Sequence, residues 1–420
     1  MLSLEFIRKN PDAVRRAAEL KGEPAPVDEI LELDRLWREH LAAAEAARHQ
    51  QNQLSKKYAA SRDATDLRNA KEIGEESKRE MAEAEAIKRQ LDDLLLRVPN
   101  VFHDSVPIGE TEAENVVVRE WGAKPDLGFA PRTHYDLGEA LGIMDFEHAA
   151  RVSGSRFAFL LGEGARLERA LVQFMLDVHT REHGYTEVWP PMLVNSASMV
   201  GTANLPKFAD AAFKVEDRDL WLIPTAEVPV TNFHREEILD ADRLPLKYVA
   251  YAPSWRTEAG AAGKDTRGFV RLHQFSKVEL VKVTSAETSL EEFEQLTRDA
   301  EDILQRLGLH YRVLAMCTGD MGFAQYKKYD LEGWAPGLDR YLEVSSCSTF
   351  NDFQAMRANI RYRPGRGAQP RYAHTINGSG LALPRTIDAI LETYQRSDGM
   401  VAVPEGLKPY MGGVELIGAR

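Results

Sequence analysis

The chain has 420 residues, of which 44% are hydrophobic, and a formal net charge of −12. This length can bury one large core and a smaller one, and the acidic balance excludes a uniformly basic nucleic-acid-binding protein, although not a local basic patch. The two cysteines, Cys317 and Cys347, exclude a disulfide framework and a four-thiolate zinc site and favour the reducing cytoplasm. We expect neither a transmembrane helix nor a signal peptide, because no apolar run has the required length and flanks.

The first predicted elements are helices. Residues 3–20 predict one short helix. Residues 27–98 then contain two series of positions that alternate steps of three and four, which is the spacing of a coiled-coil seam, with turn and capping residues at 61–66 between them. We expect an antiparallel helical hairpin that projects as an arm, since two helices of about 45 Å cannot fold into a small core. The two series are Ile30, Leu33, Trp37, His40, Ala44, Ala47, Gln51, Leu54 and Tyr58, and Ala70, Ile73, Ser77, Glu80, Ala84, Ile87, Leu91, Leu94 and Val98.

Charge is distributed unevenly along this hairpin. Basic residues gather around the predicted turn, whereas residues 28–47 and 72–97 are mainly acidic. An ordinary solvated coiled-coil surface would explain the pattern, and so would a basic tip that contacts phosphates, so the charge alone leaves both interpretations open. The basic residues of the tip are Arg48, Lys56, Lys57, Arg62, Arg68 and Lys71.

A proline-broken linker at 98–110 precedes a region of globular composition. Residues 166–184 predict an amphipathic helix that ends at Gly184, and "YTEVWPPMLV" after it predicts a strand that two prolines interrupt. The apolar face of the helix contains Leu167, Leu171, Phe174, Met175 and Val178.

The next segments predict a β-hairpin with one charged face. β-Branched and aromatic residues recur in 246–258 and 268–283, and "AGAAGKDT" at 259–266 predicts a flexible loop between the two strands. The charged face fits either a solvated sheet surface or a pocket, but arginines, a phenylalanine and carboxylates together suit a nucleotide and an amino acid. Strand alternation places Arg256, Glu258, Arg271, His273, Phe275, Lys277 and Glu279 on the charged face and Val270, Leu272, Val278 and Leu280 on the apolar face.

Two later segments favour the pocket over the solvated surface. "YLEVSSCS" at 341–348 predicts a strand in which Glu343 and Ser345 share a face, a plausible magnesium ligand set near phosphates, although a polar sheet edge remains an alternative. Residues 375–395 predict a strand that leads into a helix, with Arg385 at the helix N-terminus, where the dipole already favours anions.

These residues resemble a known family. "RTEAGAAGKDTRGFVRLHQFSKVEL" and "NGSGLALPRT" resemble the second and third signature motifs of class II aminoacyl-tRNA synthetases, in the form typical of bacterial-type seryl-tRNA synthetases. "IPTAEVPVTN" at 223–232 resembles the serine-binding loop of that family, and "GWAPGLDRYLEVSSCSTFNDFQAMRANIRYR" is similar to its segment with ATP and metal contacts. The helix that begins near Arg166 resembles the first motif, which forms the dimer interface, so the resemblance covers the whole chain.

The resemblance implies an α+β fold, with an antiparallel-sheet class II synthetase catalytic domain and helices, preceded by an N-terminal antiparallel α-helical coiled-coil arm. It implies a tRNA-binding domain at 1–105, with the hairpin at about 27–98, and a catalytic domain at 106–420. The implied reaction activates L-serine with ATP and Mg²⁺ and transfers it to tRNA(Ser), with tRNA(Sec) left open as a second substrate. The implied assembly is a homodimer that binds tRNA across its subunits, without a membrane partner.

The family also implies roles for individual residues. Arg256 would bind the α-phosphate, Phe275 would stack on adenine, and Arg385 would cover its other side and reach the γ-phosphate; with Glu279 in the serine pocket, Arg256 and Arg385 form the implied catalytic set. The implied magnesium ligands are Glu343 and Ser346, and the tip residues of the hairpin would contact tRNA. The implied serine contacts are Thr225, Ala226, Glu227, Glu279, Asn377 and Ser379. The implied ATP contacts are Arg256, Thr257, Glu258, Arg271, Leu272, Phe275, Glu343, Val344, Ser345, Ser346 and Arg385.

Some positions differ from the family pattern without removing an implied site residue. They are Lys264, Thr349, Asn351, Met356 and Pro384. Two other functions stay open at this point. A synthetase paralogue would load a different acceptor, and a non-enzymatic scaffold built on the hairpin would carry out no exchange between ATP and serine.

Overall fold

The computed structural model of the protein describes residues 1–259 and 268–418. The predicted loop at 259–266, including Lys264, lies outside the described residues except for Ala259. The chain divides into two compact units, Met1–Val101 and Phe102–Arg420. Within the described ranges, no helix combines the length and the apolar character needed to cross a membrane.

The first unit consists of four helices. They are α1 (Leu4–Lys9), α2 (Pro11–Leu20), α3 (Val27–Ser61) and α4 (Ala64–Leu95). The prediction of a single helix over 3–20 is wrong, because the chain leaves helical geometry at Asn10, with φ −134° and ψ 48°. Pro11 lacks a backbone N–H and disfavours the helical conformation of the residue before it, so it ends one helix and begins another.

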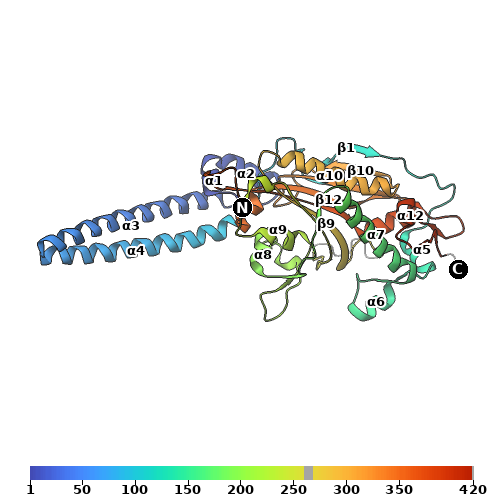
Figure 1. The fold of residues 1–420 in the computed structure, drawn as a ribbon, viewed down its shortest axis with the longest axis horizontal. Helices are drawn as coiled ribbons and strands as arrows, with labels where there is room; N and C mark the ends of the chain where they lie inside the picture. Colours follow the sequence, from blue (N-terminus) through green and yellow to red (C-terminus); the bar gives the residue numbers. More distant parts are fainter. Residues whose placement is uncertain (260–267, 419–420) are drawn as a thin grey trace. The chain divides into compact units, whose positions relative to one another are not determined.

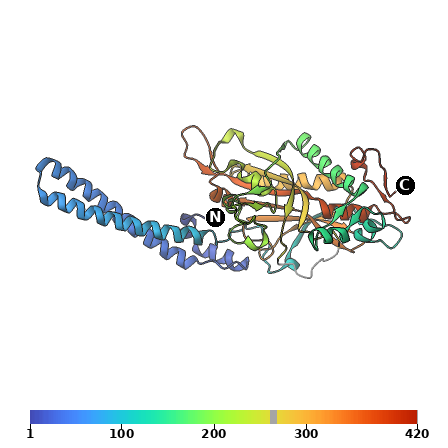
Figure 2. The same ribbon diagram turned by 90° about the horizontal axis from the view of Figure 1, so that it is seen from below.

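Helices α3 and α4 form the predicted antiparallel hairpin and lie side by side (Figure 1 and Figure 2). Arg62 takes a left-handed conformation, with φ 57°, and Asp63 caps α4 by accepting a hydrogen bond from the Thr65 backbone N–H at 2.8 Å. Every position of the two predicted seam series is buried or half-buried. At Gly74 a Cβ atom would lie 2.4 Å from Gln51 Nε2, so the flexible end of the Gln51 side chain occupies the space that a side chain at Gly74 would take.

At the base of the hairpin, α1 and α2 pack on α3. Ile7, Ile30 and Leu91 are fully buried. Asp34 is only 1% exposed, and it accepts hydrogen bonds from Arg8 at 3.3 Å and from Arg38 at 3.1 Å. The first unit therefore has a core of its own, with its one deeply buried carboxylate in this region paired to two arginines.

The second unit is built on an eight-stranded sheet with the strand order β1-β10-β11-β12-β15-β9-β8-β4. All neighbouring strands are antiparallel except β4 and β8. The predicted α+β class with an antiparallel sheet is therefore confirmed. The strands are β1 (Val116–Trp121), β4 (Thr186–Glu187), β8 (Leu246–Trp255), β9 (Gln274–Thr284), β10 (Tyr311–Ala315), β11 (Lys327–Ala335), β12 (Arg340–Asn351) and β15 (His374–Ala382).

Shorter strands and eight helices surround this sheet in the described part of the unit. The strands are β2 (Met144–Asp145), β3 (Phe159–Leu160), β5 (Leu193–Val194), β6 (Trp221–Leu222), β7 (Ile238–Asp240), β13 (Arg361–Arg363), β14 (Arg371–Tyr372), β16 (Val401–Ala402) and β17 (Leu416–Ile417). The helices are α5 (His134–Ala140), α6 (Phe146–Ser153), α7 (Gly162–Arg181), α8 (Ser196–Gly201), α9 (Glu227–Thr231), α10 (Ser289–Arg306), α11 (Phe353–Ala358) and α12 (Leu383–Thr393).

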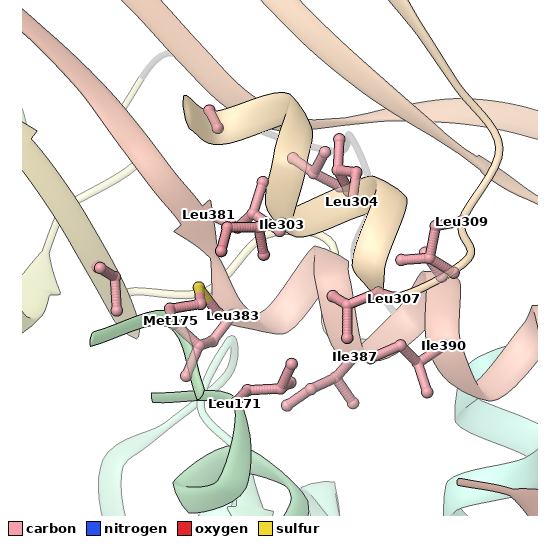
Figure 3. Packing of buried hydrophobic residues seen from close by; sticks show 14 of the residues in the cluster. Leu171, Met175, Ile303, Leu304, Leu307, Leu309, Leu381, Leu383, Ile387 and Ile390 are labelled. Carbon is pink, nitrogen blue, oxygen red and sulfur yellow. The ribbon is translucent and has the colours of Figure 1, made fainter. Parts of the chain in front are cut away.

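Helices α7, α10 and α12 pack against one face of the sheet and form its main core. Figure 3 shows buried side chains of α7, α10, α12 and β15 gathered in one cluster, among them Leu171, Ile303, Ile387 and Leu381. Every residue of the predicted apolar face of α7 is buried in this core, so that prediction is confirmed. Because burying one such side chain stabilises the fold by about 1.5–3 kcal/mol, this core fixes α12 and the strands beside it.

The predicted β-hairpin is correct in its central part and wrong at its ends. Strands β8 and β9 pair with Ala250 opposite Glu279 and Ala252 opposite Lys277. Residues 256–258 and 268–273 lie outside the strands, and Glu258 has a φ of 52°. Strand alternation therefore holds for Phe275, Lys277 and Glu279 but does not apply before Gln274.

Strand β12 contains a β-bulge at Val344. Its partner strand pairs Glu332 with Glu343 and the next residue, Leu331, with Ser345, so Val344 is the extra residue. Val344 and Cys347 both lie in the main core. The expectation that Glu343 and Ser345 share a face is therefore wrong, because the bulge shifts the alternation by one residue.

Candidate active site

A pocket of about 330 Å³ opens on the sheet face that does not carry the main core. Its walls come from β9, β11, β12, β15, the N-terminal ends of α9 and α12 and the segments that follow β8 and precede β9. These segments are distant in sequence, and the sheet order brings them together. The implied site residues that line the pocket are Thr225, Glu227, Arg256, Glu258, Arg271, Leu272, Phe275, Glu279, Glu343, Ser346, Asn377, Ser379 and Arg385.

Other residues of the implied set lie beside the pocket, within the described part of the chain, but outside its lining. Ser345 is 1% exposed and donates its hydroxyl to Ser379 O at 2.6 Å, because the bulge turns it away from the pocket. Thr257 donates its hydroxyl to Asp210 O at 2.6 Å. Ala226 and Val344 are buried in apolar clusters.

One end of the pocket is rich in carboxylates. Asn377 Nδ2 donates to Glu279 Oε1 at 3.3 Å, and Glu279 is itself 1% exposed. Lys277 pairs with Glu279 and donates to Thr225 Oγ1 at 2.9 Å. The sequence placed Lys277 on the charged face without a role, and its spacing of two residues from Glu279 was the available signal. This end therefore already holds one ammonium group between two of the residues implied to bind serine.

Glu227 lies at the same end and is coupled to Glu279. Burial and the neighbouring charge of Glu279 raise the pKa of Glu227 to about 7, while a hydrogen bond from Gln354 and the charges of Lys277 and Arg256 oppose the rise. Two carboxylates in one buried site repel each other unless a cation joins them. A ligand with an ammonium group would therefore be attracted to this end of the pocket.

The other end is rich in arginine. The Arg256 guanidinium lies 5.2 Å from the centre of the Phe275 ring, and its Nε donates to Pro224 O at 3.3 Å. Arg271 forms an ion pair with Glu258 at 2.8 Å. A planar ring beside guanidinium groups suits a base attached to phosphates, because arginine binds phosphate oxygens in a bidentate manner.

Arg385 lies in the first turn of α12 and is held at three points. Its Nε donates to Val270 O at 3.1 Å, its Nη1 donates to Glu343 O at 2.8 Å, and Nη1 lies 3.5 Å from the Glu343 carboxylate. Burial raises the pKa of Glu343, but Arg385, Lys328 and other cations outweigh it and lower the pKa overall. A carboxylate that stays ionised beside Arg385 can compete with phosphates for that cation or bridge to them through a divalent ion.

One member of a buried charged pair lines the pocket, and the sequence gave neither residue a role. Lys328 lines the pocket and pairs with Asp330 at 3.0 Å. Burial raises the pKa of Asp330 to about 7, and Glu343 adds to this rise. Alternation along β11 places both side chains on one face, but the charges of this strand gave no reason to connect it with the other motifs.

The donor set at this position fits a magnesium ion that is shared with phosphates. Glu343 and Ser346 line the same pocket and offer a carboxylate and a hydroxyl. Mg²⁺ is commonly held by one or two carboxylates together with substrate phosphates and water. Among residues 1–259 and 268–418, no group of three or more His, Cys, Asp or Glu side chains could hold a metal ion by itself. The oxygen donors therefore fit a magnesium ion that arrives with a nucleotide.

Comparison with known proteins places the chain. Residues 1–102 match the seryl-tRNA synthetase N-terminal domain, and residues 213–394 match the class II tRNA synthetase core domain of the G, H, P, S and T type. A protein of Caldanaerobacter subterraneus subsp. tengcongensis named serine–tRNA ligase is 55% identical over 98% of both chains. A serine–tRNA ligase of Thermoanaerobacter pseudethanolicus is 52% identical, also over 98% of both chains.

Solved structures agree with these sequence matches. A seryl-tRNA synthetase from Pyrococcus horikoshii, solved with ATP, is 41% identical and superposes with a TM-score of 0.95 over 99% of both chains. The cytoplasmic serine–tRNA ligase of Naegleria fowleri, solved with AMP, is 33% identical, with a TM-score of 0.88 over 98% of this chain and 96% of that one. The resemblance seen in the motifs thus extends over the full length of both units, and the chain belongs to the seryl-tRNA synthetase family of class II synthetases.

Proposed function

We propose that the protein is an ATP-dependent ligase that activates L-serine as seryl-adenylate and transfers the seryl group to the 3′ end of tRNA(Ser). The observation that carries this proposal is the division of one pocket into a carboxylate end and an arginine end. A free amino acid and a nucleoside triphosphate are the pair of ligands that such a division suits. Full-length relatives named serine–tRNA ligase, at up to 55% identity among those described above, support the choice of serine.

ATP binds at the arginine end. Arg256 holds the α-phosphate, and Arg271 lies near the phosphates once it leaves Glu258. The adenine base stacks on Phe275, with Glu258 at its amino group and Arg385 on its other side. Arg271 is paired with Glu258 and Arg385 with Glu343 in the same pocket, so nucleotide binding exchanges one set of anions for another.

Serine binds at the carboxylate end. Glu227 and Glu279 hold its ammonium group, and Thr225, Asn377 and Ser379 contact the rest of the amino acid. Lys277 gives up its place beside Glu279 to the incoming ammonium and turns its charge toward the carboxylate of serine or the α-phosphate. A pocket that hydrogen-bonds the serine hydroxyl rejects alanine, because bound alanine would leave the buried polar groups of the pocket without a partner.

Glu343 and Ser346 would hold Mg²⁺, since their carboxylate and hydroxyl oxygens line the pocket. The ion supplies charge neutralisation for the triphosphate when it is bound. Lys328 of the same pocket is paired with Asp330, which keeps the local charge balanced. Removal of Mg²⁺ should therefore abolish adenylate formation without unfolding the protein.

The reaction needs positioning more than a protein nucleophile. A carboxylate oxygen of serine attacks the α-phosphorus in line, an O–P bond forms, and the bond to pyrophosphate breaks. A ribose hydroxyl at the 3′ end of tRNA then attacks the adenylate carbonyl, an ester forms, and AMP leaves. Arg256 and Arg385 stabilise the charge that grows on the phosphate oxygens, and their fixed positions remove most of the entropic cost of alignment.

The remaining parts of the proposal concern partners and location. Residues 1–105 form the tRNA-binding domain, and the basic tip of the hairpin contacts tRNA phosphates, which the family match over 1–102 supports. Residues 106–420 form the catalytic domain.

The protein acts as a homodimer that binds tRNA across its subunits. We place it in the cytoplasm, because both cysteines carry free, buried thiols.

The experiment that tests the function is amino-acid-dependent exchange of pyrophosphate into ATP, measured with a panel of amino acids. Serine should support exchange at least about a hundredfold better than alanine or threonine. Charging of bulk tRNA, compared with charging of a carrier protein, tests the acceptor. Exchange without charging of tRNA would favour a paralogue that loads another acceptor, and absence of exchange with every amino acid would refute the proposal.

A further inference from the structure

Gln354 of α11 lies behind the carboxylate end of the pocket and is 1% exposed. Its Nε2 donates to Glu227 Oε1 at 2.6 Å and reaches Thr202 O at 3.5 Å. Its Oε1 accepts a hydrogen bond from the Thr375 hydroxyl of β15 at 2.7 Å. Thr375 is also 1% exposed, so a chain of two short hydrogen bonds joins β15 to Glu227 through the glutamine amide.

The partners fix the orientation of this amide. A carboxylate accepts hydrogen bonds, so the NH₂ group of Gln354 must face Glu227. The remaining amide oxygen then faces the Thr375 hydroxyl, which can donate. Rotation of the amide by half a turn would place two oxygens against each other at 2.6 Å and leave the threonine hydroxyl without an acceptor.

The hydrogen bond from Gln354 opposes the effect of burial on the ionisation of Glu227. Burial and the charge of Glu279 favour the neutral form of the Glu227 carboxyl, whereas Lys277, Arg256 and the Gln354 hydrogen bond favour the ionised form. An ionised carboxylate attracts an ammonium group, and a protonated one does not. Both cations in this balance face ligand in the pocket, whereas Gln354 is buried behind it, so its contribution persists when ligands rearrange the cations.

We propose that Gln354, held by Thr375, is a positioning residue that keeps the Glu227 carboxylate in the orientation and charge state that bind the ammonium group of serine. This inference rests on the proposed function, since it assigns Glu227 to that ammonium group. Gln354 touches no reacting atom, and it acts through Glu227.

The test uses the full-length protein and serine-dependent pyrophosphate exchange between pH 6 and pH 9. Gln354→Met keeps the size of the side chain but removes the donor, so the KM for serine should rise about tenfold to a hundredfold at pH 7. Part of this rise in the KM for serine should disappear at pH 9, where Glu227 ionises even without the hydrogen bond from the glutamine. The KM for ATP should stay within about twofold, because the arginine end is unchanged.

Thr375 supplies a second, independent variant. Thr375→Val has the same shape but no hydroxyl, so the amide of Gln354 loses the donor that holds its oxygen, and the KM for serine should rise about fivefold to tenfold. Thr375→Ser restores the donor and should return the KM to within about twofold of the original protein. If Gln354→Met does not fold, this pair of variants decides the question.

A matched control is Gln395→Met. Gln395 is a buried glutamine, 4% exposed, whose amide bonds to Arg132 O at 3.0 Å, outside the pocket lining. Its variant should lower the melting temperature without changing the KM for serine or its pH dependence. The inference would be overturned if the KM for serine changes less than twofold in Gln354→Met and Thr375→Val. It would also be overturned if the KM values for serine and ATP rise equally and the rise does not depend on pH. Failure of the original protein to exchange with serine would instead refute the proposed function.

Discussion

The helical hairpin and the pocket are both densely charged, but they hold their charges in different ways. On α3, Arg35 pairs with Glu32 and Glu39 at 2.6 Å, one turn away on either side, and all three side chains are about half-exposed. In the pocket, Lys277 and Glu279 are 9% and 1% exposed, and their partners come from separate segments of the chain. Exposed ion pairs within one helix each stabilise the fold by a few tenths of a kcal/mol, whereas removal of one partner of a buried ion pair destabilises the fold by about 3–5 kcal/mol.

The comparison shows how each region can function. A surface charge on the hairpin can act only as one of many, through a summed field that salt screens. A buried charge in the pocket acts individually, because water cannot replace its partner. We therefore expect single substitutions to abolish function in the pocket and only to reduce it on the hairpin.

The largest expected effect follows from Arg256→Ala. The guanidinium beside Phe275 would be lost, and with it the proposed stabilisation of transition-state charge on the α-phosphate, so pyrophosphate exchange should fall about a thousandfold or more. The melting temperature should change little. Arg298→Ala is the matched control, because Arg298 is exposed on α10 and bonds only to Gln295 among its described partners. Near-normal exchange by the Arg256 variant would exclude the phosphate role.

Removal of the hairpin tests most directly whether the hairpin and the pocket contribute to different activities. Replacing residues 35–90 by a short glycine turn should leave pyrophosphate exchange within about twofold, because the pocket lies entirely in the second compact unit. Charging of tRNA should fall about a hundredfold or more, since the phosphate contacts of the tip would be lost. Equal loss of both activities would contradict the assignment of separate roles.

A milder version of this test concerns the tip alone. Lys56→Ala should weaken tRNA binding about threefold and lower the salt dependence of the affinity by about one counterion. Arg35→Ala at the acidic base of the hairpin should leave both unchanged, because Arg35 is already paired with two glutamates. A salt-independent affinity in the original protein would refute phosphate contacts at the tip.

Glu227→Gln should have opposite effects on binding and stability. The affinity for serine should fall about tenfold or more, because the ammonium group loses a charged partner. The folded-state pKa of about 7 lies above the ordinary value of 4.5, so burial of Glu227 destabilises the folded protein increasingly as the pH rises from about 4.5 to about 7, and by a constant amount above that. The free energy of unfolding of the variant should therefore exceed that of the original protein by about 1–2 kcal/mol at pH 8 and by little at pH 5. Thermal melting at both pH values measures this, and an equal gain at both would contradict the raised pKa.

The smallest effects concern two glycines with different surroundings. At Gly74 of the hairpin, an added Cβ meets the flexible end of Gln51, so Gly74→Ala should stabilise the protein by up to about 0.5–1 kcal/mol. At Gly378 of the sheet, the Cβ would lie 2.5 Å from Leu296 Cδ2 and 2.8 Å from Cys347 Sγ, so Gly378→Ala should destabilise it by about 1–3 kcal/mol. Shifts of the same sign in thermal melting would show that the two regions tolerate added volume alike.

The sequence predicted those features that depend on regular periodicity. The hairpin followed from heptad spacing, the buried face of α7 from helical spacing, and the orientation of Phe275 and Glu279 from alternation along one strand. Each of these signals is local, because neighbouring residues in a regular element have fixed relative directions. The resemblance to a family then connected the separate motifs.

The features that were missed break periodicity or join distant segments. Pro11 interrupts a helical pattern, and residues 269–272 line the pocket without belonging to a strand, so Val270 and Leu272 lie beside Arg271 in its walls. The bond from Gln354 to Glu227 spans 127 positions. Side chains that far apart meet only through the topology of the sheet, which no local pattern encodes.

The bulge at Val344 decides which changes of length β12 tolerates. Glu343 precedes the extra residue and Ser346 follows it, and both reach the pocket although two residues separate them, because the bulge shifts the alternation by one residue. Exchange of Val344 for another aliphatic residue should be nearly silent. Loss of one residue at this point would leave a single residue between Glu343 and Ser346, and residues with that spacing share a face in a regular strand, so both would still reach the pocket. The partner strand would also keep its pairing on both sides, because Val344 is the residue without a partner. A sequence that is one residue shorter here should therefore keep the carboxylate and the hydroxyl at the pocket.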